Sequence, residues 1–407
     1  MSQRSQAPGQ DPPARTGGSY AALLRVPHVG SQAVLGLLAE LTQGAAPVGL
    51  VLVVHKATGS LISAGAVSAA LWLGAAVARP IQGRLIDRHG TRIVMLACGP
   101  VHAVALAGVV LVAWAGGAVW AMVPLSAVAG LALPPVSVAM RVEWGRHVPA
   151  NERTAAFSLV YLTQEIALVT GPLLIAALLG FGAGVGLITA AIISGVATVG
   201  FAALGTSEAT VHKAPAHTGS GRATSLPAVL AVAFLLGSML GVFQVAAPSL
   251  AIARGLPAIG GVLIAAVSVG GISGAVLYGA IRWKADPATR LILLLALLAV
   301  ATTALLAVLP LAAVGLLLAV GGLALNPAFA TTSLLIDRHG GSRGAEAFGW
   351  MSTAGGSGTA AGNAVAGALA QHNGFPPAFF AATVAAYAAV LISCSAAWLS
   401  RSRTPRP

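Results

Sequence analysis

The stretch from Leu291 to Leu309 reads LILLLALLAVATTALLAVL and contains no charged side chain. A helix needs about 20 apolar residues to cross the hydrocarbon core of a bilayer. Further stretches of this kind follow one another along the chain, and because they are continuously apolar rather than alternating, they predict helices and not barrel strands. The twelve expected spans are 30–54, 58–80, 93–114, 118–140, 155–179, 183–205, 227–251, 257–281, 290–309, 311–334, 345–371 and 375–399.

The composition of the 407-residue chain also predicts an integral membrane protein. Hydrophobic residues make up 57% of it and charged residues only 8%, whereas soluble domains carry about 25% charged residues. The formal net charge is +12, but the basic residues are spread thinly between apolar runs, and a nucleic-acid-binding face needs them clustered. We therefore expect contact with the lipid bilayer and none with nucleic acid. Cys98 and Cys394 lie far apart in apolar segments, so no disulfide is expected.

The basic residues also predict the orientation of the spans. With the N-terminus in the cytoplasm, 20 of the 22 Lys and Arg residues fall in or beside cytoplasmic segments, leaving only Lys56 and Arg254 outside. The first twenty residues are polar and lack the apolar core of a cleavable signal peptide. We expect a multi-pass protein of the cytoplasmic (inner) membrane with both termini cytoplasmic.

A weak internal repeat relates the two halves of the chain. Residues 127–135 read AVAGLALPP and residues 319–327 read AVGGLALNP, an offset of 192. Glycines of spans 2 and 8 match at an offset of 196, and an Ala-Phe pair and a glycine of spans 5 and 11 match at an offset of 191. Since six spans separate the partners, both copies have the same orientation, the parallel arrangement of one large class of secondary transporters.

The repeat predicts two bundles on either side of a polar connection. The expected parts are a cytoplasmic tail (1–20), an N-terminal six-helix bundle (21–205), a cytoplasmic central loop (206–226), a C-terminal six-helix bundle (227–399) and a cytoplasmic tail (400–407). The hexapeptide LIDRHG occurs at 85–90 and at 335–340, but its offset of 250 places the copies after spans 2 and 10, which are not equivalent. We interpret the second copy as coincidence or convergent loop chemistry, and Trp283 as the counterpart of Asp87.

The loop between spans 2 and 3 resembles the signature loop of the major facilitator superfamily, G-x-L-A-D-R-x-G-R-K. It reads GRLIDRHGTR over residues 83–92. The matching residues are Gly83, Leu85, Asp87, Arg88 and Gly90, with Arg92 a conservative change from Lys and Ile86 and Thr91 as departures. The resemblance implies an all-α fold of two six-helix bundles, and a loop that latches the cytoplasmic side by docking against span 11 in the outward-open state. The alternative is a solvated basic loop that only fixes the topology.

A second resemblance lies in span 5. Gly171-Pro172 is similar to the end of the glycine-rich motif found in proton-coupled drug exporters of this superfamily, although Ala167 and Ser158 stand where glycines are expected. The arginine usual in span 4 is replaced by Ser126. The resemblance therefore points to bacterial exporters without implying their standard proton relay.

Two acids fall near the middle of predicted spans, where ionisable residues are costly and suggest function. Glu40 and Glu165 each lie roughly 15 Å along their helices. Gln43 shares the helical face of Glu40, and Tyr161 and Gln164 form a polar stripe with Glu165. We expect these five residues to take part in substrate binding or proton coupling. The alternative is an acid kept neutral in a structural hydrogen bond between helices.

The second half offers fewer polar groups at this depth. Its counterpart of Glu165 is Gly356, and its candidates are Gln244, Asn326 and Asn363, which either hydrogen-bond a substrate or join helices. His102 is a packed histidine or, less favoured, a proton relay. A charged cluster in the loop after span 4 forms either a gating ion-pair network or a solvated loop; its members are Arg141, Glu143, Arg146, Glu152 and Arg153.

These observations predict a secondary transporter. A membrane cavity with two acids and no Lys or Arg favours cationic or neutral organic compounds over anions. We expect proton-coupled export by alternating access, without a cofactor and driven by the proton gradient, in a monomer. An importer or facilitator, a channel and a non-transporting membrane sensor are alternatives. No HExxH, GxSxG or P-loop motif is present, so neither an enzyme nor an ATP-driven pump is expected.

Overall fold

The computed structural model describes residues 19–182, 184–204, 226–307, 309–339, 343–373 and 375–402. These residues form helices and contain no strand, which confirms the predicted all-α class. The predicted central loop (206–226) and the two tails (1–20 and 400–407) lie almost entirely outside the described residues.

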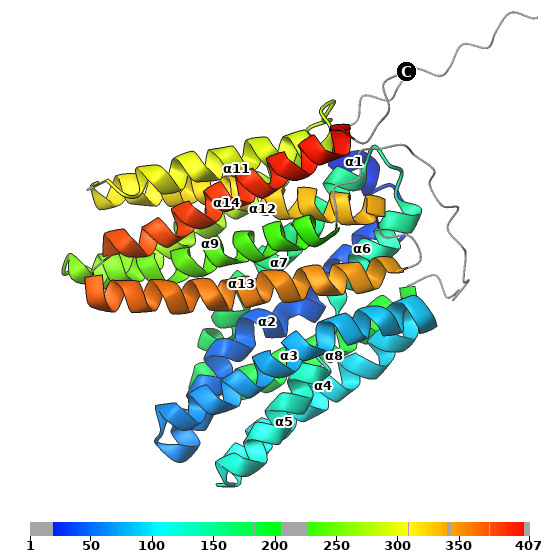
Figure 1. Ribbon diagram of the computed structural model, residues 1–407. Coiled ribbons are helices and arrows are strands. Elements are labelled where there is room, and N and C mark those ends of the chain that lie inside the picture. Colours follow the sequence, from blue (N-terminus) through cyan, green and yellow to red (C-terminus); the bar gives the residue numbers. More distant parts are fainter. Residues whose placement is uncertain are drawn as a thin grey trace, which may run out of the picture.

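The helices form two bundles, one from each half of the chain (Figure 1). The first bundle holds α2 (Val29–Thr58), α3 (Leu61–His89), α4 (Thr91–Trp114), α5 (Val119–Leu131), α6 (Val136–His147), α7 (Arg153–Leu178) and α8 (Val185–Leu204), with a 3-10 turn η1 (Leu179–Phe181). The second holds α9 (Leu226–Ala253), α10 (Pro257–Ala280), α11 (Pro287–Ala304), α12 (Leu311–His339), α13 (Gly344–Asn373) and α14 (Phe375–Ser402). A short helix α1 (Ser19–Leu23) packs against α7 and α10.

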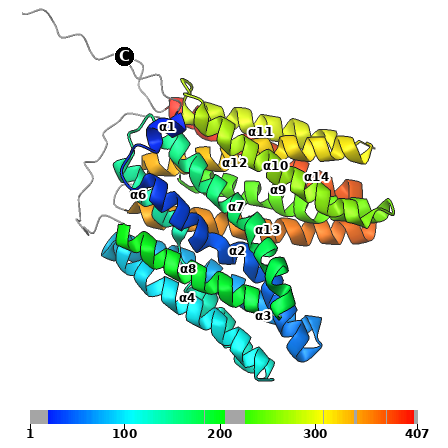
Figure 2. The ribbon, with the colours of Figure 1, turned by 180° about the vertical axis from the view of Figure 1, so that it is seen from behind.

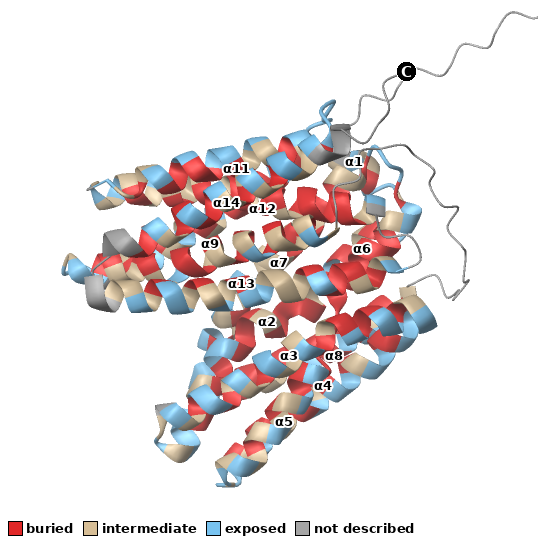
Figure 3. Ribbon diagram, in the orientation of Figure 1, coloured by how far each residue is buried: buried red, intermediate tan, exposed pale blue. Residues whose placement is uncertain are grey.

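Eleven segments of the described chain are long and apolar enough to cross a membrane. The remaining expected span, 345–371, coincides with α13, a 30-residue helix that packs along α9. Its many Gly, Ala, Ser and Thr residues lower its hydropathy without shortening it. Large apolar side chains such as Leu73, Val104 and Leu293 are exposed on the outer faces of the bundles, as expected for contact with lipid, while buried residues line the inner faces (Figure 3).

Span 4 is broken near its middle. Helix α5 ends at Leu131, and α6 begins at Val136, after Pro134 and Pro135. Proline has no N–H to donate and its ring clashes with the preceding turn, so consecutive prolines interrupt a helix. The break carries α6 into the interior, where every residue from Val136 to Trp144 is buried.

The helix packing within each bundle agrees with the internal repeat. A Cβ added to Gly74 would meet the carbonyl oxygen of Ala127, and one added to Gly270 would meet that of Ala319. The glycines differ by the offset of 196 and the alanines by 192. Equivalent helices therefore approach each other through equivalent small residues.

The bundles meet at one end of the molecule and diverge toward the other (Figures 1 and 2). We call the end that holds α1 and the C-terminus of α14 the termini end, and the opposite one the far end. Phe157 and Phe348, which are equivalent in the repeat, meet across the boundary in an edge-to-face contact with ring centroids 6.0 Å apart. Because the two residues are equivalent in the repeat, the pseudo-two-fold axis that relates the two halves passes close to this contact.

Candidate substrate and coupling site

Glu165 lies near the middle of α7, at the boundary between the bundles. Its Oε1 accepts a hydrogen bond of 3.1 Å from Nδ2 of Asn326, which lies on α12 of the other bundle. Ser268 on α10 is the other polar side chain beside it. No ion pair joins Glu165 to a basic residue in the part of the chain that the structure describes. The structure thus brings two of the predicted site residues together across the bundle boundary.

Gly271 makes room for this pair. A Cβ at position 271 would stand 2.6 Å from Nδ2 of Asn326 and 3.4 Å from Oε1 of Glu165. Any side chain there would push the amide away, so the contact depends on the absence of one.

An aromatic layer lies one turn of α7 closer to the termini end. Tyr161 stacks on Phe329 of α12 with ring centroids 5.6 Å apart. Its hydroxyl lies 3.3 Å from Oγ of Ser333, also on α12. The polar stripe predicted on α7 therefore contacts α12 along two successive turns.

Glu40 is in a different environment, inside the N-terminal bundle. Its side chain is buried, and neither oxygen has a hydrogen-bond partner among the described residues. The amides of Gln43 and Gln164 lie beside the carboxyl without reaching hydrogen-bond geometry, and the guanidinium groups of Arg141 and Arg79 attract it. Glu40 is therefore compensated by positive charge, whereas Glu165 has only neutral partners.

The expectation of a site without Lys or Arg was wrong. Arg141, predicted to lie in a loop after span 4, is only 2% exposed. Its guanidinium carbon stands 4.9 Å from the ring centroid of Tyr161 and 5.9 Å from that of Phe348. The Pro134-Pro135 pair was the available signal, because a helix restarted there need not follow the line of span 4.

The other candidates lie apart from Glu165. Gln244 is exposed on α9, and Asn363 is half-buried on α13, with no partner for its Oδ1 in the described chain. His102 is fully buried, with Nδ1 2.7 Å from the carbonyl oxygen of Ala129 and Nε2 3.1 Å from Oγ1 of Thr42. These contacts agree with the favoured interpretation of a packed histidine.

The loop between α3 and α4 docks on the N-terminus of α13, at the termini end. The carboxylate of Asp87 accepts hydrogen bonds from the backbone N–H groups of Ala345 (3.0 Å) and Glu346 (2.9 Å). Gly83 lies so close to α13 that a Cβ would stand 2.5 Å from the carbonyl oxygen of Ala345. Gly90 joins α3 to α4 with φ 83°, a conformation that favours glycine. We call the Gly83, Asp87, Ala345 and Glu346 contact the first latch.

Other basic residues of this loop lie around the first latch. Arg84 pairs with Glu346 at 2.7 Å, although the arginine side chain is 55% exposed. Arg88 and Arg92 are exposed. The structure thus places Asp87 where the family resemblance implied, while its role as a gate stays a prediction.

The start of α7 is held by the C-terminal bundle in a corresponding way. Nη1 of Arg153 lies 2.7 Å from Oδ2 of Asp337, and Nη2 of Arg282 lies 3.7 Å from Oε1 of Glu152. Asp337 belongs to the second LIDRHG copy. We call the contact of Arg153 with Asp337 and of Arg282 with Glu152 the second latch. Two members of the predicted charged cluster, Glu152 and Arg153, therefore form ion pairs across the bundle boundary.

The Asp286 carboxylate supports the neighbouring turn before α11 from outside the spans. It caps α11 by accepting from the N–H of Ala288 and pairs with Arg338 at 2.7 Å. Partial burial alone would raise the pKa of Asp286, but the bonds from Arg338 and Ala288 together lower that pKa below its ordinary value.

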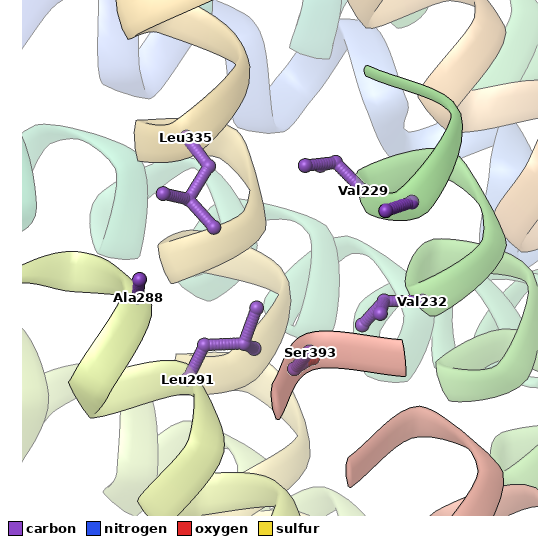
Figure 4. Close-up of a pocket in the computed structure, with 7 residues that line it drawn as sticks. Val229, Val232, Ala288, Leu291, Leu335 and Ser393 are labelled. Atoms are coloured by element: carbon purple, nitrogen blue, oxygen red, sulfur yellow. The ribbon is translucent and has the colours of Figure 1, made fainter. Parts of the chain in front are cut away.

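Two further features lie away from Glu165. Gly171 packs directly on the backbone of Gly44 and Ala45 of α2, so the Gly171-Pro172 motif serves close packing of α7 on α2. A small pocket inside the C-terminal bundle is lined by Val229, Val232, Leu291, Leu335 and Ser393, with Ala228 and Ala288 (Figure 4). It contains none of the predicted site residues. Within the described ranges, no three or more His, Cys, Asp or Glu side chains lie close enough together to hold a metal ion.

Comparison with known proteins defines the class. The family model of the Major Facilitator Superfamily matches residues 33–345. The chain belongs to this superfamily, and it is therefore a multi-pass membrane transporter of the secondary class and not an enzyme.

Solved structures show the same fold. A bacterial homologue of the iron transporter ferroportin in its outward-facing state aligns with a TM-score of 0.73 at 16% identity, covering 92% of this chain and 99% of that one. The human organic anion transporter MFSD10 aligns with a TM-score of 0.72 at 16% identity, covering 91% of this chain and 99% of that one. The E. coli fucose:proton symporter FucP aligns with a TM-score of 0.68 at 13% identity, covering 90% of this chain and 98% of that one. At these identities the likeness concerns the fold, and a search of curated protein sequences gave no match.

Proposed function

We propose that this protein exports small cationic or neutral organic compounds in exchange for protons, by alternating access, as a monomer in the cytoplasmic membrane. The observation that carries the proposal is Glu165, a mid-membrane acid at the bundle boundary whose partners are all neutral. An uncompensated carboxylate at membrane depth is costly. A proton or a positively charged substrate lowers that cost, so the two compete for one group.

Glu40 has a different part in this proposal. The guanidinium groups of Arg141 and Arg79 attract its carboxyl group. We assign it to holding these cations in place rather than to binding the substrate. The buried Arg141 and the half-buried Arg79 thus weaken the sequence-based exclusion of anions without supplying Glu165 itself with a counter-charge.

The contacts between the bundles support alternating access. Both latches lie at the termini end, which the distribution of basic residues assigns to the cytoplasm. With that assignment the molecule is closed toward the cytoplasm and its bundles diverge toward the outside (Figure 1). Export requires both latches to open so that Glu165 becomes accessible from the cytoplasm.

The test is transport by the purified protein in liposomes. A lipophilic cation such as tetraphenylphosphonium, or a fluorescent one such as ethidium, is followed after a pH gradient is imposed. We expect gradient-driven flux for the wild type and a loss of at least tenfold for Glu165→Gln. The matched control is Asp286→Asn, an acid-to-amide change outside the spans, which should keep most of the flux. Equal flux in the wild type and Glu165→Gln would reject the proposed role of Glu165.

The same site serves an importer equally well, and FucP shows that this fold supports proton symport. Reversing the imposed gradient distinguishes the two directions. In an exporter, substrate moves against the direction of proton flow, whereas in a symporter it moves with it. Flux that ignores the gradient would instead indicate a facilitator.

A further inference from the structure

The contact between Glu165 and Asn326 is the place where the two halves of the chain differ most in chemistry. By the offsets of the repeat, Glu165 corresponds to Gly356, and Asn326 corresponds to Pro134. Gly271 corresponds to Ala75, which is buried and carries a side chain. The acid, the amide and the glycine therefore occur together at one of the two repeat-related interfaces and not at the other.

The equivalent region of the other interface, between α13 and α3, is bridged differently. There the hydroxyl of Thr353 donates to the backbone carbonyl of Ala76 at 3.3 Å. A Cβ at Gly356 would touch nothing within 4 Å. At the repeat position of Asn326, the carbonyl of Pro134 accepts from Arg79 within its own bundle at 3.3 Å. Pro134 has no side-chain donor, whereas Asn326 at the equivalent position carries an amide that donates to the other bundle.

We propose that Asn326 is the positioning residue of Glu165: its carboxamide, carried by the C-terminal bundle, holds the Glu165 carboxyl while the termini end is closed and leaves it when the bundles separate there. The inference rests on the proposed function of Glu165 as the coupling acid. Gly271 contributes by leaving the space in which the amide lies.

This arrangement links proton binding to conformation. Glu165 has its donor in one state of the transporter and loses it in the other, so its affinity for a proton differs between the states. A ligand that binds two states unequally shifts their populations, and the effect is reciprocal. Protons at Glu165 therefore bias the equilibrium of the bundles, with Asn326 as the group through which the C-terminal bundle takes part.

Other titratable groups stand on the helices packed against α7. They include Tyr20 on α1, Glu40 on α2, Arg141 on α6, Tyr278 on α10 and Asp337 at the end of α12. The hydroxyl of Tyr20 donates to the carbonyl of Ala275, and the hydroxyl oxygen of Tyr278 lies 2.6 Å from Oγ1 of Thr331. Arg141 stacks on Tyr161, and Asp337 pairs with Arg153. Glu40 lies inside the N-terminal bundle, beside Gln43 and Gln164. Asn326 and Ser268 are the polar side chains that lie beside Glu165.

The experiment follows the bundles directly and needs no substrate. Spin labels are placed on Ile62→Cys and Val262→Cys, which are 87% and 61% exposed near the far ends of the two bundles, in full-length protein carrying Cys98→Ala and Cys394→Ala. The distance between the labels is measured by pulsed electron resonance as a function of pH. We expect the wild type to change its distance distribution with one midpoint, and Glu165→Gln to remove that transition.

Asn326→Ala should remove most of the pH-dependent change in the distance distribution, because the donated hydrogen bond that makes the proton affinity of Glu165 differ between the two states is then missing in both. Gly271→Ala should weaken the transition in the same way, which provides a second variant if Asn326→Ala does not fold. The control is Thr332→Ala, a buried position of α12 whose hydroxyl donates to the carbonyl of Ala328 in its own helix; its pH transition should match that of the wild type.

An exchanged pair separates positioning from mere packing. In the double variant Glu165→Gln with Asn326→Asp, the donor and the acid change bundles, and we expect the pH transition lost in Glu165→Gln to return. If the wild type and Glu165→Gln behave as expected but Asn326→Ala and Gly271→Ala keep the full wild-type transition, the inference about Asn326 is wrong and the proposed function stands. If the wild type shows no pH transition, both are overturned.

Discussion

The two latches join the bundles at the termini end through different chemistry. In the first, the carboxylate of Asp87 accepts two backbone N–H groups at the start of α13. In the second, the start of α7 is held by side-chain ion pairs, Arg153 with Asp337 and Arg282 with Glu152. The repeat explains the difference, because the counterpart of Asp87 is Trp283, an indole that cannot accept such bonds. Trp283 instead donates to the carbonyl of Tyr278 at 2.9 Å.

The position equivalent to Asp87 in the C-terminal bundle holds no acid, and the acid of the second latch is instead Asp337, at the end of α12. That residue lies in a hexapeptide identical to the one that contains Asp87. Backbone donors at a helix N-terminus are fixed and carry the partial positive charge of the helix, whereas two long side chains lose rotamer freedom when they pair. We therefore expect the first latch to be the stronger one.

The largest effect is expected from Gly83→Leu. The new side chain would meet the backbone of α13, so it should prevent the first latch from closing at all. We expect a shift of about 4 kcal/mol toward the state open at the termini end, from overpacking and from lost hydrogen bonds of Asp87. The distance between labels at Ile62→Cys and Val262→Cys should shorten. Gly65→Leu, where a Cβ meets nothing within 4 Å, is the control and should leave the distance unchanged.

Asp87→Ala should come next. It removes both acceptors of the α13 N–H groups, and hydrogen bonds to a charged group contribute about 1.5–3 kcal/mol each. Since water can replace part of them at this end, we expect a shift of about 2 kcal/mol in the same direction. Asp87→Asn, which keeps one acceptor oxygen, should give roughly half of that shift. An unchanged label distance in Asp87→Ala would show that the first latch does not hold the bundles.

Breaking the second latch should have a smaller effect. Arg153→Ala leaves Asp337 without this partner in a partly buried position, and we expect a shift of about 1 kcal/mol, above the usual value for exposed pairs. The exchange Arg153→Asp with Asp337→Arg should recover most of it, whereas each single charge reversal should be worse than the alanine variant. If Arg153→Ala exceeds Asp87→Ala, the ranking of the two latches is reversed.

The smallest effect is expected from Arg84→Ala. Its ion pair with Glu346 is short, at 2.7 Å, but the arginine side chain is more than half exposed. Such pairs contribute about 0–1 kcal/mol and are screened by salt. The label distance should change little, and raising the ionic strength should remove the difference from the wild type. A large and salt-insensitive change would place Arg84 within the first latch itself.

The candidate site was predictable only in part. The position of Glu165 in a long apolar run gave its depth, and the stripe with Tyr161 and Gln164 gave the face of the helix on which it lies. Periodicity cannot say which helix covers that face, so Asn326 and Asn363 were equally good candidates. The distinction came from the docking of the bundles, which places α12 and not α13 against this part of α7.

The membrane environment, the long apolar spans, the repeat and the loop around Asp87 were predictable from the sequence alone. Each of these depends on local composition or on short-range patterns, because lipid requires about 20 apolar residues per span wherever they occur. Only the tertiary structure decided the burial of Arg141, the pairing of Arg153 with Asp337 and the amide that contacts Glu165. Those contacts join residues far apart in the chain, and they form because the two bundles meet along surfaces that no local pattern specifies.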